Sequence, residues 1–79
     1  MQYEQLIKSD GCNIRYIENP SEELQKLAVR YDGRAIQYIE SPSEEVQLAA
    51  VRNNNYAIEY IKNRTEKVQF ASIKYSTYV

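Results

Sequence analysis

The chain has 79 residues, enough for one small domain whose core lies near the lower limit for folding unaided. Ten basic and eleven acidic side chains leave a net charge of −1, so the composition provides no general electrostatic attraction to nucleic acid or to a membrane surface. Without histidine, and with one cysteine and two glycines, the sequence argues against a histidine-assisted nucleophile, a metal centre and a glycine-rich phosphate loop. We therefore expect no enzyme, no metal and no cofactor.

The sequence also bears on where the protein works. No apolar run reaches the length of a transmembrane helix, and the N-terminus lacks the apolar region of a signal peptide. The lone Cys12 has no partner for an internal disulfide, which favours a reducing environment. These features predict a cytoplasmic, intracellular protein with no membrane segment.

A 22-residue unit recurs along the chain. Residues 34–55 are one copy, residues 12–33 match it closely and residues 56–77 match it more loosely. Because such a short unit cannot bury its apolar face alone, the repeat predicts a solenoid in which neighbouring copies cover one another. We expect a single all-α domain over residues 1–79, divided into an N-terminal half repeat at 1–11 and repeats at 12–33, 34–55 and 56–79.

In chain order, the first expected element is a lone helix within residues 1–11 that caps the stack. Each repeat then supplies a shorter and a longer helix, which makes about seven short helices in all. Isoleucines three residues apart, such as Ile14 and Ile17, share one face of the shorter helix, which is too short to be stable alone. The longer helix shows apolar residues at helical spacing. The shorter helices are expected near 12–18, 34–40 and 56–62, and the longer ones near 20–31, 42–53 and 64–75.

A capping pattern marks the start of each longer helix. The predicted N-caps are Asn19, Ser41 and Asn63, because a glutamate stands three residues after each, as in a capping box. Proline at 20 and 42 would then occupy the first helical position, where a missing N–H costs nothing. Gly11 and Gly33 follow helix ends and are predicted to be left-handed C-caps.

The segment Asn-Pro-Ser-Glu-Glu-Leu-Gln at 19–25, followed by Ala-Val-Arg at 28–30, resembles a family of short tandem α-helical repeats of unknown function, which is similar to miniature HEAT and variant leucine-rich repeats. Residues 41–52 repeat this motif. The third copy departs from it, with Arg64 in place of proline, Lys67 in place of the second glutamate and no closing glycine. The resemblance spans nearly the whole chain; it implies an α-solenoid and offers no catalytic residues.

The repeat symmetry breaks in one column of the longer helices. Lys26 belongs to a charged row, whereas its equivalents, Leu48 and Phe70, each stand between a glutamate and a cation on a face expected to lie in water. Together they form either a small apolar contact site or, if the C-terminal tail folds over Phe70, a covered patch. We expect a protein-binding module, such as a small inhibitor or adaptor that occupies a larger protein's surface. The predicted protein-binding residues are Leu48, Phe70, Arg52, Lys74, Tyr75 and Tyr78.

A second column, Tyr16, Tyr38 and Tyr60, supplies one tyrosine per repeat. These side chains lie away from the isoleucine face of the shorter helices. They form either a ladder that packs between repeats or a rigid aromatic binding stripe, because tyrosine is a favoured interface anchor.

Two further alternatives concern the charges and the C-terminal end. One cation per repeat gives a basic column that is either a solvated face or a track for nucleic acid or a nucleotide, and neighbouring glutamates weaken the second interpretation. The end of the stack is either sealed by the tail that contains Tyr75 and Tyr78 or used as the interface of a homodimer. The basic column consists of Lys8, Arg30, Arg52 and Lys74.

Overall fold

The computed structural model describes the backbone of residues 2–77 and the side chains of residues 3–74. Within this part of the chain the secondary structure is entirely helical, as the repeat predicts, and the all-α fold is confirmed. Three elements are 3₁₀-helices and carry the label η. In chain order the elements are α1 (Gln2–Ser9), η1 (Gly11–Tyr16), α2 (Glu22–Tyr31), η2 (Gly33–Tyr38), α3 (Glu44–Asn53), η3 (Asn55–Tyr60) and α4 (Glu66–Thr77).

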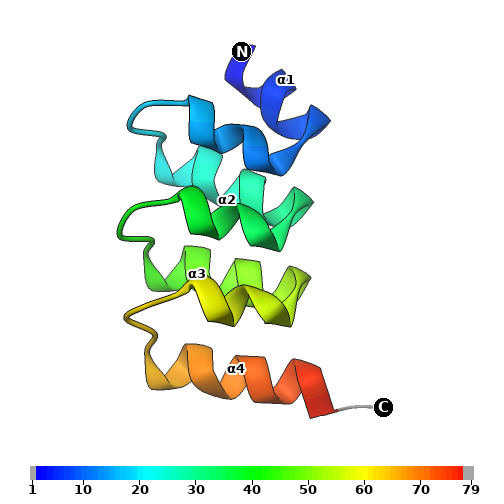
Figure 1. Ribbon diagram of the computed structural model, residues 1–79, viewed down its shortest axis with the longest axis vertical. Coiled ribbons are helices and arrows are strands. Elements are labelled where there is room, and N and C mark those ends of the chain that lie inside the picture. Colours follow the sequence, from blue (N-terminus) through cyan, green and yellow to red (C-terminus); the bar gives the residue numbers. More distant parts are fainter. Residues whose placement is uncertain (1, 78–79) are drawn as a thin grey trace.

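The elements stack in chain order along the longest axis of a body that measures 37 × 25 × 16 Å. Figure 1 shows α1 at one end and α4 at the other, with a 3₁₀-helix between each α-helix and the next. The three loops that lead from a 3₁₀-helix into the following α-helix all lie on one edge of the stack (Figure 1). Equivalent residues of successive repeats are therefore neighbours in space.

The core runs through the middle of the stack. Ile14 and Ile36 of the 3₁₀-helices and Val29 and Val51 of the α-helices are almost completely buried. Ile17 follows η1 directly as its C-cap, donates its N–H to the Ile14 carbonyl oxygen at 3.0 Å and is also buried. This burial confirms the expected isoleucine face.

The longer helices begin two residues later than predicted, because other residues cap them. Oγ of Ser21 accepts a hydrogen bond from the Leu24 N–H at 3.2 Å, and Oγ of Ser43 accepts one from the Val46 N–H at 3.3 Å. In the third repeat Oγ1 of Thr65 accepts from the N–H three residues on, at 3.3 Å. Each cap offers the hydroxyl oxygen that the orphan N–H groups of a helix start require.

The predicted caps Asn19, Ser41 and Asn63 are therefore wrong. Asn19 and Ser41 have φ values of 53° and 54°, in the left-handed region, whereas an N-cap needs extended backbone. Each precedes a proline, so Pro20 and Pro42 lie ahead of the cap rather than at the first helical position. The paired glutamates still fall in the first turn, where the helix dipole favours negative charge.

The two glycines serve close packing, so their prediction as left-handed C-caps is also wrong. Neither has a positive φ, and each is the first residue of a 3₁₀-helix. A Cβ on Gly33 would lie 2.6 Å from the carbonyl oxygen of Ala50, and a Cβ on Gly11 would clash in the same way with that of Ala28. Glycine lets each 3₁₀-helix lie directly against the following α-helix. Asn55 takes this position in the third repeat.

The shorter helices also differ from their prediction, in type and in position. They are 3₁₀-helices that begin one residue early, because the side chain just before each one acts as its cap. The Oδ1 atoms of Asp10, Asp32 and Asn54 each accept a hydrogen bond from the backbone N–H two residues on, at 3.0 to 3.1 Å.

Candidate functional site

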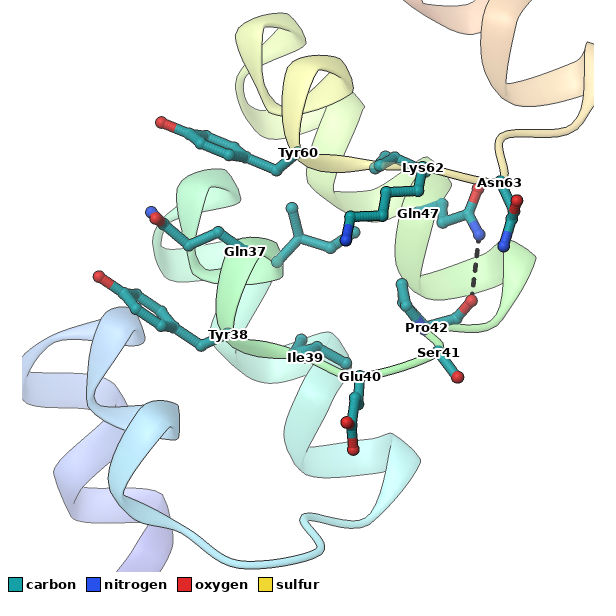
Figure 2. Close-up of a pocket in the computed structure, with 12 residues that line it drawn as sticks. Gln37, Tyr38, Ile39, Glu40, Ser41, Pro42, Gln47, Tyr60, Lys62 and Asn63 are labelled. Atoms are coloured by element: carbon teal, nitrogen blue, oxygen red, sulfur yellow. Dashed lines mark hydrogen bonds between the residues drawn. The ribbon is translucent and has the colours of Figure 1, made fainter.

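Tyr16, Tyr38 and Tyr60 form a stripe, one tyrosine at the end of each 3₁₀-helix. Their side chains are 68%, 39% and 43% exposed, so they lie on the surface beside the core rather than within it. Figure 2 shows Tyr38 and Tyr60 projecting in the same direction from successive layers. The stripe therefore presents a row of aromatic rings to solvent, and we call it the tyrosine stripe.

Arg15 clamps the first two rings of the tyrosine stripe. Its Nη2 donates a hydrogen bond to the Tyr16 hydroxyl at 2.8 Å, and its Nη1 donates one to the Tyr38 hydroxyl at 3.2 Å. The guanidinium carbon lies 4.8 Å from the Tyr16 ring centroid and 5.4 Å from that of Tyr38, within the range of cation–π attraction. The two hydrogen bonds raise the pKa of Arg15 above its ordinary value. These contacts hold two exposed aromatic rings in a fixed arrangement.

A groove of about 530 Å³ opens between η2 and η3, with Tyr38 and Tyr60 at one end (Figure 2). Gln47 of α3 lies at the other end and is only 6% exposed. Its Nε2 donates a hydrogen bond to the Pro42 carbonyl oxygen at 3.0 Å. Its Oε1 is buried and accepts no hydrogen bond from any of the residues described here. The sequence does not indicate this groove, because each repeat has a Gln at this position and nothing in the pattern marks Gln47 as the one buried beside a cavity.

The residues predicted for protein binding through the α-helices do not form one uniform patch. Leu48 is partly buried and packs against the core, so the expectation that it lies in water is wrong. Lys26, its equivalent in the first repeat, has a side chain only 29% exposed, which indicates that this column lies at the margin of the core. Phe70 is 68% exposed, and Arg52 and Lys74 are exposed. The side chain of Tyr75 and the whole of Tyr78 lie outside the described residues.

The α-helix face carries acidic and basic side chains side by side. Lys26 Nζ lies 3.1 Å from an oxygen of Glu45, and Lys67 Nζ lies 3.8 Å from one of Glu44, so both ion pairs link successive repeats. The Glu45 carboxylate raises the pKa of Lys26. Glutamates are interleaved with the cations of the predicted basic column along the same helices. All four members of this column are exposed, namely Lys8, Arg30, Arg52 and Lys74.

Asp10 and Cys12, at the boundary between the N-terminal half repeat and the first repeat, meet Asp32 near the end of the first repeat, with one potential ligand atom from each within 4.8 Å of the others. Sequence spacing did not suggest this cluster, because Cys12 and Asp32 are 20 residues apart and are brought together only by the stacking of the repeat units. The Cys12 Sγ lies 3.7 Å from Asp32 Oδ2. Burial raises the pKa of the Cys12 thiol, and the two carboxylates raise it further. Hydrogen bonds from Arg34 hold the pKa of Asp32 below its usual range. Capping and the Arg34 ion pair account for both carboxylates, so we assign the cluster no metal.

Among the described residues, no helix has the length and apolar character that a membrane span needs. Comparisons with protein-family models, curated proteins and solved structures found no match to this chain.

Proposed function

We propose that this chain is a non-enzymatic protein-binding module that binds through the tyrosine stripe and the adjoining groove. The observation that carries the proposal is the clamp of Arg15 on Tyr16 and Tyr38, which holds exposed aromatic side chains in place before any partner arrives. Tyrosine is among the residues most often found at the centres of binding energy in interfaces. Because the rings are already ordered, binding loses less side-chain entropy.

The groove supports the same proposal. It lies directly beside the stripe, and its volume of about 530 Å³ falls within the range of small binding clefts. It combines apolar walls, such as Ile36 and Ile39, with polar groups at Gln47 and Asn63. A partner that covers the stripe can therefore insert a segment into the groove. On this proposal the protein acts as a small inhibitor or adaptor, by occupying the surface of a larger protein.

The proposal is tested by affinity capture from the native cell with the wild type and two matched variants. Tyr38→Ala combined with Tyr60→Ala removes two rings of the stripe. Tyr56→Ala serves as the control, because Tyr56 is 70% exposed and lies at the opposite end of η3. We expect a partner that is retained by the wild type and by the control and is lost by the double variant, with all three proteins equally helical. Retention of the same partner by the double variant would refute binding through the stripe.

A second candidate surface lies on α4. Ile73 is 49% exposed, whereas the equivalent Val29 and Val51 are completely buried. With Phe70 one turn away, Ile73 forms an exposed apolar pair of the kind found in contact sites. This pair supports contact with a partner or with a second copy as a homodimer. Light scattering at high micromolar concentration tests self-association: a dimer that Phe70→Glu dissociates supports it, and a monomeric wild type refutes it.

The proposal also covers the repeat family, the cellular location and the ranking of nucleic-acid binding. Membership of a family of short tandem HEAT-like repeats is supported by the 22-residue period of the helix pairs. A cytoplasmic location is supported by the free thiol of Cys12. Nucleic-acid binding ranks below protein binding because glutamates interrupt the basic column; salt-sensitive binding of single strands would reverse that order.

A further inference from the structure

Arg15 shows how two tyrosines of successive repeats hold a guanidinium group. We call the space between Tyr16 and Tyr38 the first slot and the space between Tyr38 and Tyr60 the second slot. In the first slot Arg15 makes both of the hydrogen bonds and both of the cation–π contacts described above. The chain thus contains, within its own fold, an arginine site built from two tyrosines.

The second slot has the same walls but lacks the arginine. Gln37 stands one repeat after Arg15, and Figure 2 shows its side chain between the rings of Tyr38 and Tyr60. A glutamine is shorter than an arginine and carries no positive charge, so it cannot make the cation–π contacts. The groove opens at this same place, and both tyrosines and Gln37 line it.

We propose that the second slot binds an arginine side chain of the partner protein, an inference that rests on the protein-binding function proposed above. The incoming guanidinium takes the position that Arg15 takes in the first slot, against the two rings and with its N–H groups directed at their hydroxyls. The Tyr38 oxygen has two lone pairs, so it accepts from Arg15 and from the partner at once. Gln37 Nε2 donates a hydrogen bond to the Arg34 carbonyl oxygen at 3.1 Å, and its uncharged amide does not compete for the cation–π contacts. Arginine is preferred to lysine because its planar guanidinium stacks on rings and carries five donors in a rigid fork.

The groove gives the direction in which the rest of the partner segment lies. It runs from the two tyrosines to Gln47, whose Oε1 is buried below the surface and lies out of reach of a partner's donor. The ligand is therefore an arginine on a segment that extends from the second slot along the groove.

Two charged side chains line the groove and act in opposite directions on such a ligand. Glu40 attracts a guanidinium, whereas Lys62, whose side chain lies along the groove in Figure 2, repels it. Both side chains are exposed, so salt screens their effects. On this basis Lys62→Gln binds the arginine ligand more tightly than the wild type, and Glu40→Gln binds it more weakly.

The test uses two capped pentapeptides, acetyl-Gly-Gly-Arg-Gly-Gly-amide and its lysine counterpart, with NMR detection of labelled tyrosine rings. We expect the arginine peptide to shift the ring signals of Tyr38 and Tyr60, and the lysine peptide to bind at least about 3-fold more weakly. Gln37→Arg fills the second slot from within the chain and abolishes these shifts. Gln37→Met, which has a similar length and no guanidinium, retains them and is the matched control.

Arg15→Gln provides the reciprocal test, because it empties the first slot. In this variant the ring of Tyr16 becomes responsive to the arginine peptide, and the chain binds two peptides instead of one. Equal binding of the two peptides, an absence of ring shifts, or undiminished binding by Gln37→Arg would each overturn the arginine site. A partner protein that Gln37→Arg captures as well as the wild type, and that the double tyrosine variant loses, overturns the arginine site while the protein-binding function stands.

Discussion

Replacing Gly33 with alanine is expected to weaken the junction between η2 and α3. The new Cβ would lie 2.6 Å from the carbonyl oxygen of Ala50, about 1 Å short of an ordinary van der Waals contact. Both atoms belong to the backbone or are fixed to it, so a side-chain rotation does not relieve the clash. The 3₁₀-helix has to move away from the α-helix that it packs against.

The expected change in the free energy of unfolding is the sum of two destabilising effects and one stabilising effect. Overpacking of this kind costs about 1–3 kcal/mol. The displacement also strains the hydrogen bond from the Gly33 N–H to Asn53 Oδ1, which is 2.7 Å long and contributes about 1 kcal/mol. Alanine also lowers the conformational entropy of the unfolded chain, which stabilises the folded protein by about 0.4–1 kcal/mol. The net loss is about 2 kcal/mol, which lowers the Tm of a chain of this size by about 10 °C.

Thermal and urea unfolding followed by far-UV circular dichroism measure this loss. Asn55→Ala is the matched control, because Asn55 occupies the equivalent position in the third repeat and already carries a Cβ. We expect the control to remain within about 0.5 kcal/mol of the wild type. If Gly33→Ala unfolds at the wild-type temperature, or if both variants lose the same stability, the assignment of this glycine to close packing is wrong.

Three further predictions follow from the caps and the charged cluster. Ser43→Ala is expected to lower the free energy of unfolding by about 1 kcal/mol through loss of the α3 cap, whereas Ser41→Ala should lower it much less. Urea titrations measure both variants, and a larger loss for Ser41→Ala would indicate that Ser41 is the cap, as the sequence predicted. Asp32→Asn keeps an amide that can cap η2, as Asn54 caps η3, but loses the Arg34 ion pair. Because folding lowers the pKa of Asp32, the wild type's advantage over this variant should be complete above about pH 4 and disappear as the pH falls below the folded pKa; a constant Tm difference down to the lowest pH would contradict it. Cys12, whose thiol pKa is raised, should react with iodoacetamide more slowly than a free cysteine at about pH 8, and faster in Asp32→Asn; equal rates in the two proteins would remove Asp32 as a cause.

The sequence by itself determined the helical stack. A 22-residue period with apolar residues at helical spacing leaves each copy with a face that only another copy can cover, and this holds whatever the details of the turns. Burial of Ile14 and Ile36 followed from position within the repeat, whereas the column that contains Phe70 did not behave uniformly, since its member Leu48 is partly buried. The sequence placed the members of the tyrosine stripe off the isoleucine face, but it left open whether they pack between repeats or face solvent, and the structure shows them exposed.

Local signals were ambiguous at the helix starts. Asn19 and Ser21 are both good capping residues, two positions apart, and either one fits the sequence before the helix. The left-handed backbone at Asn19 decides in favour of Ser21, and that backbone depends on how the loop returns to the stack. The packing role of Gly33 could not be predicted from the sequence either. A side chain at this position is excluded by the carbonyl oxygen of Ala50, which belongs to the next α-helix.

Only the tertiary structure decided the candidate site. The first slot exists because stacking brings Tyr16 and Tyr38, one repeat apart in sequence, onto the same guanidinium. The second slot and the orphan oxygen of Gln47 depend on the packing of η2, η3 and α3 around one groove. Periodicity specifies which residues recur on a face, because it is a property of the chain. Which side chains meet across layers, and which polar atoms are left without a partner, is fixed by the distances between those layers.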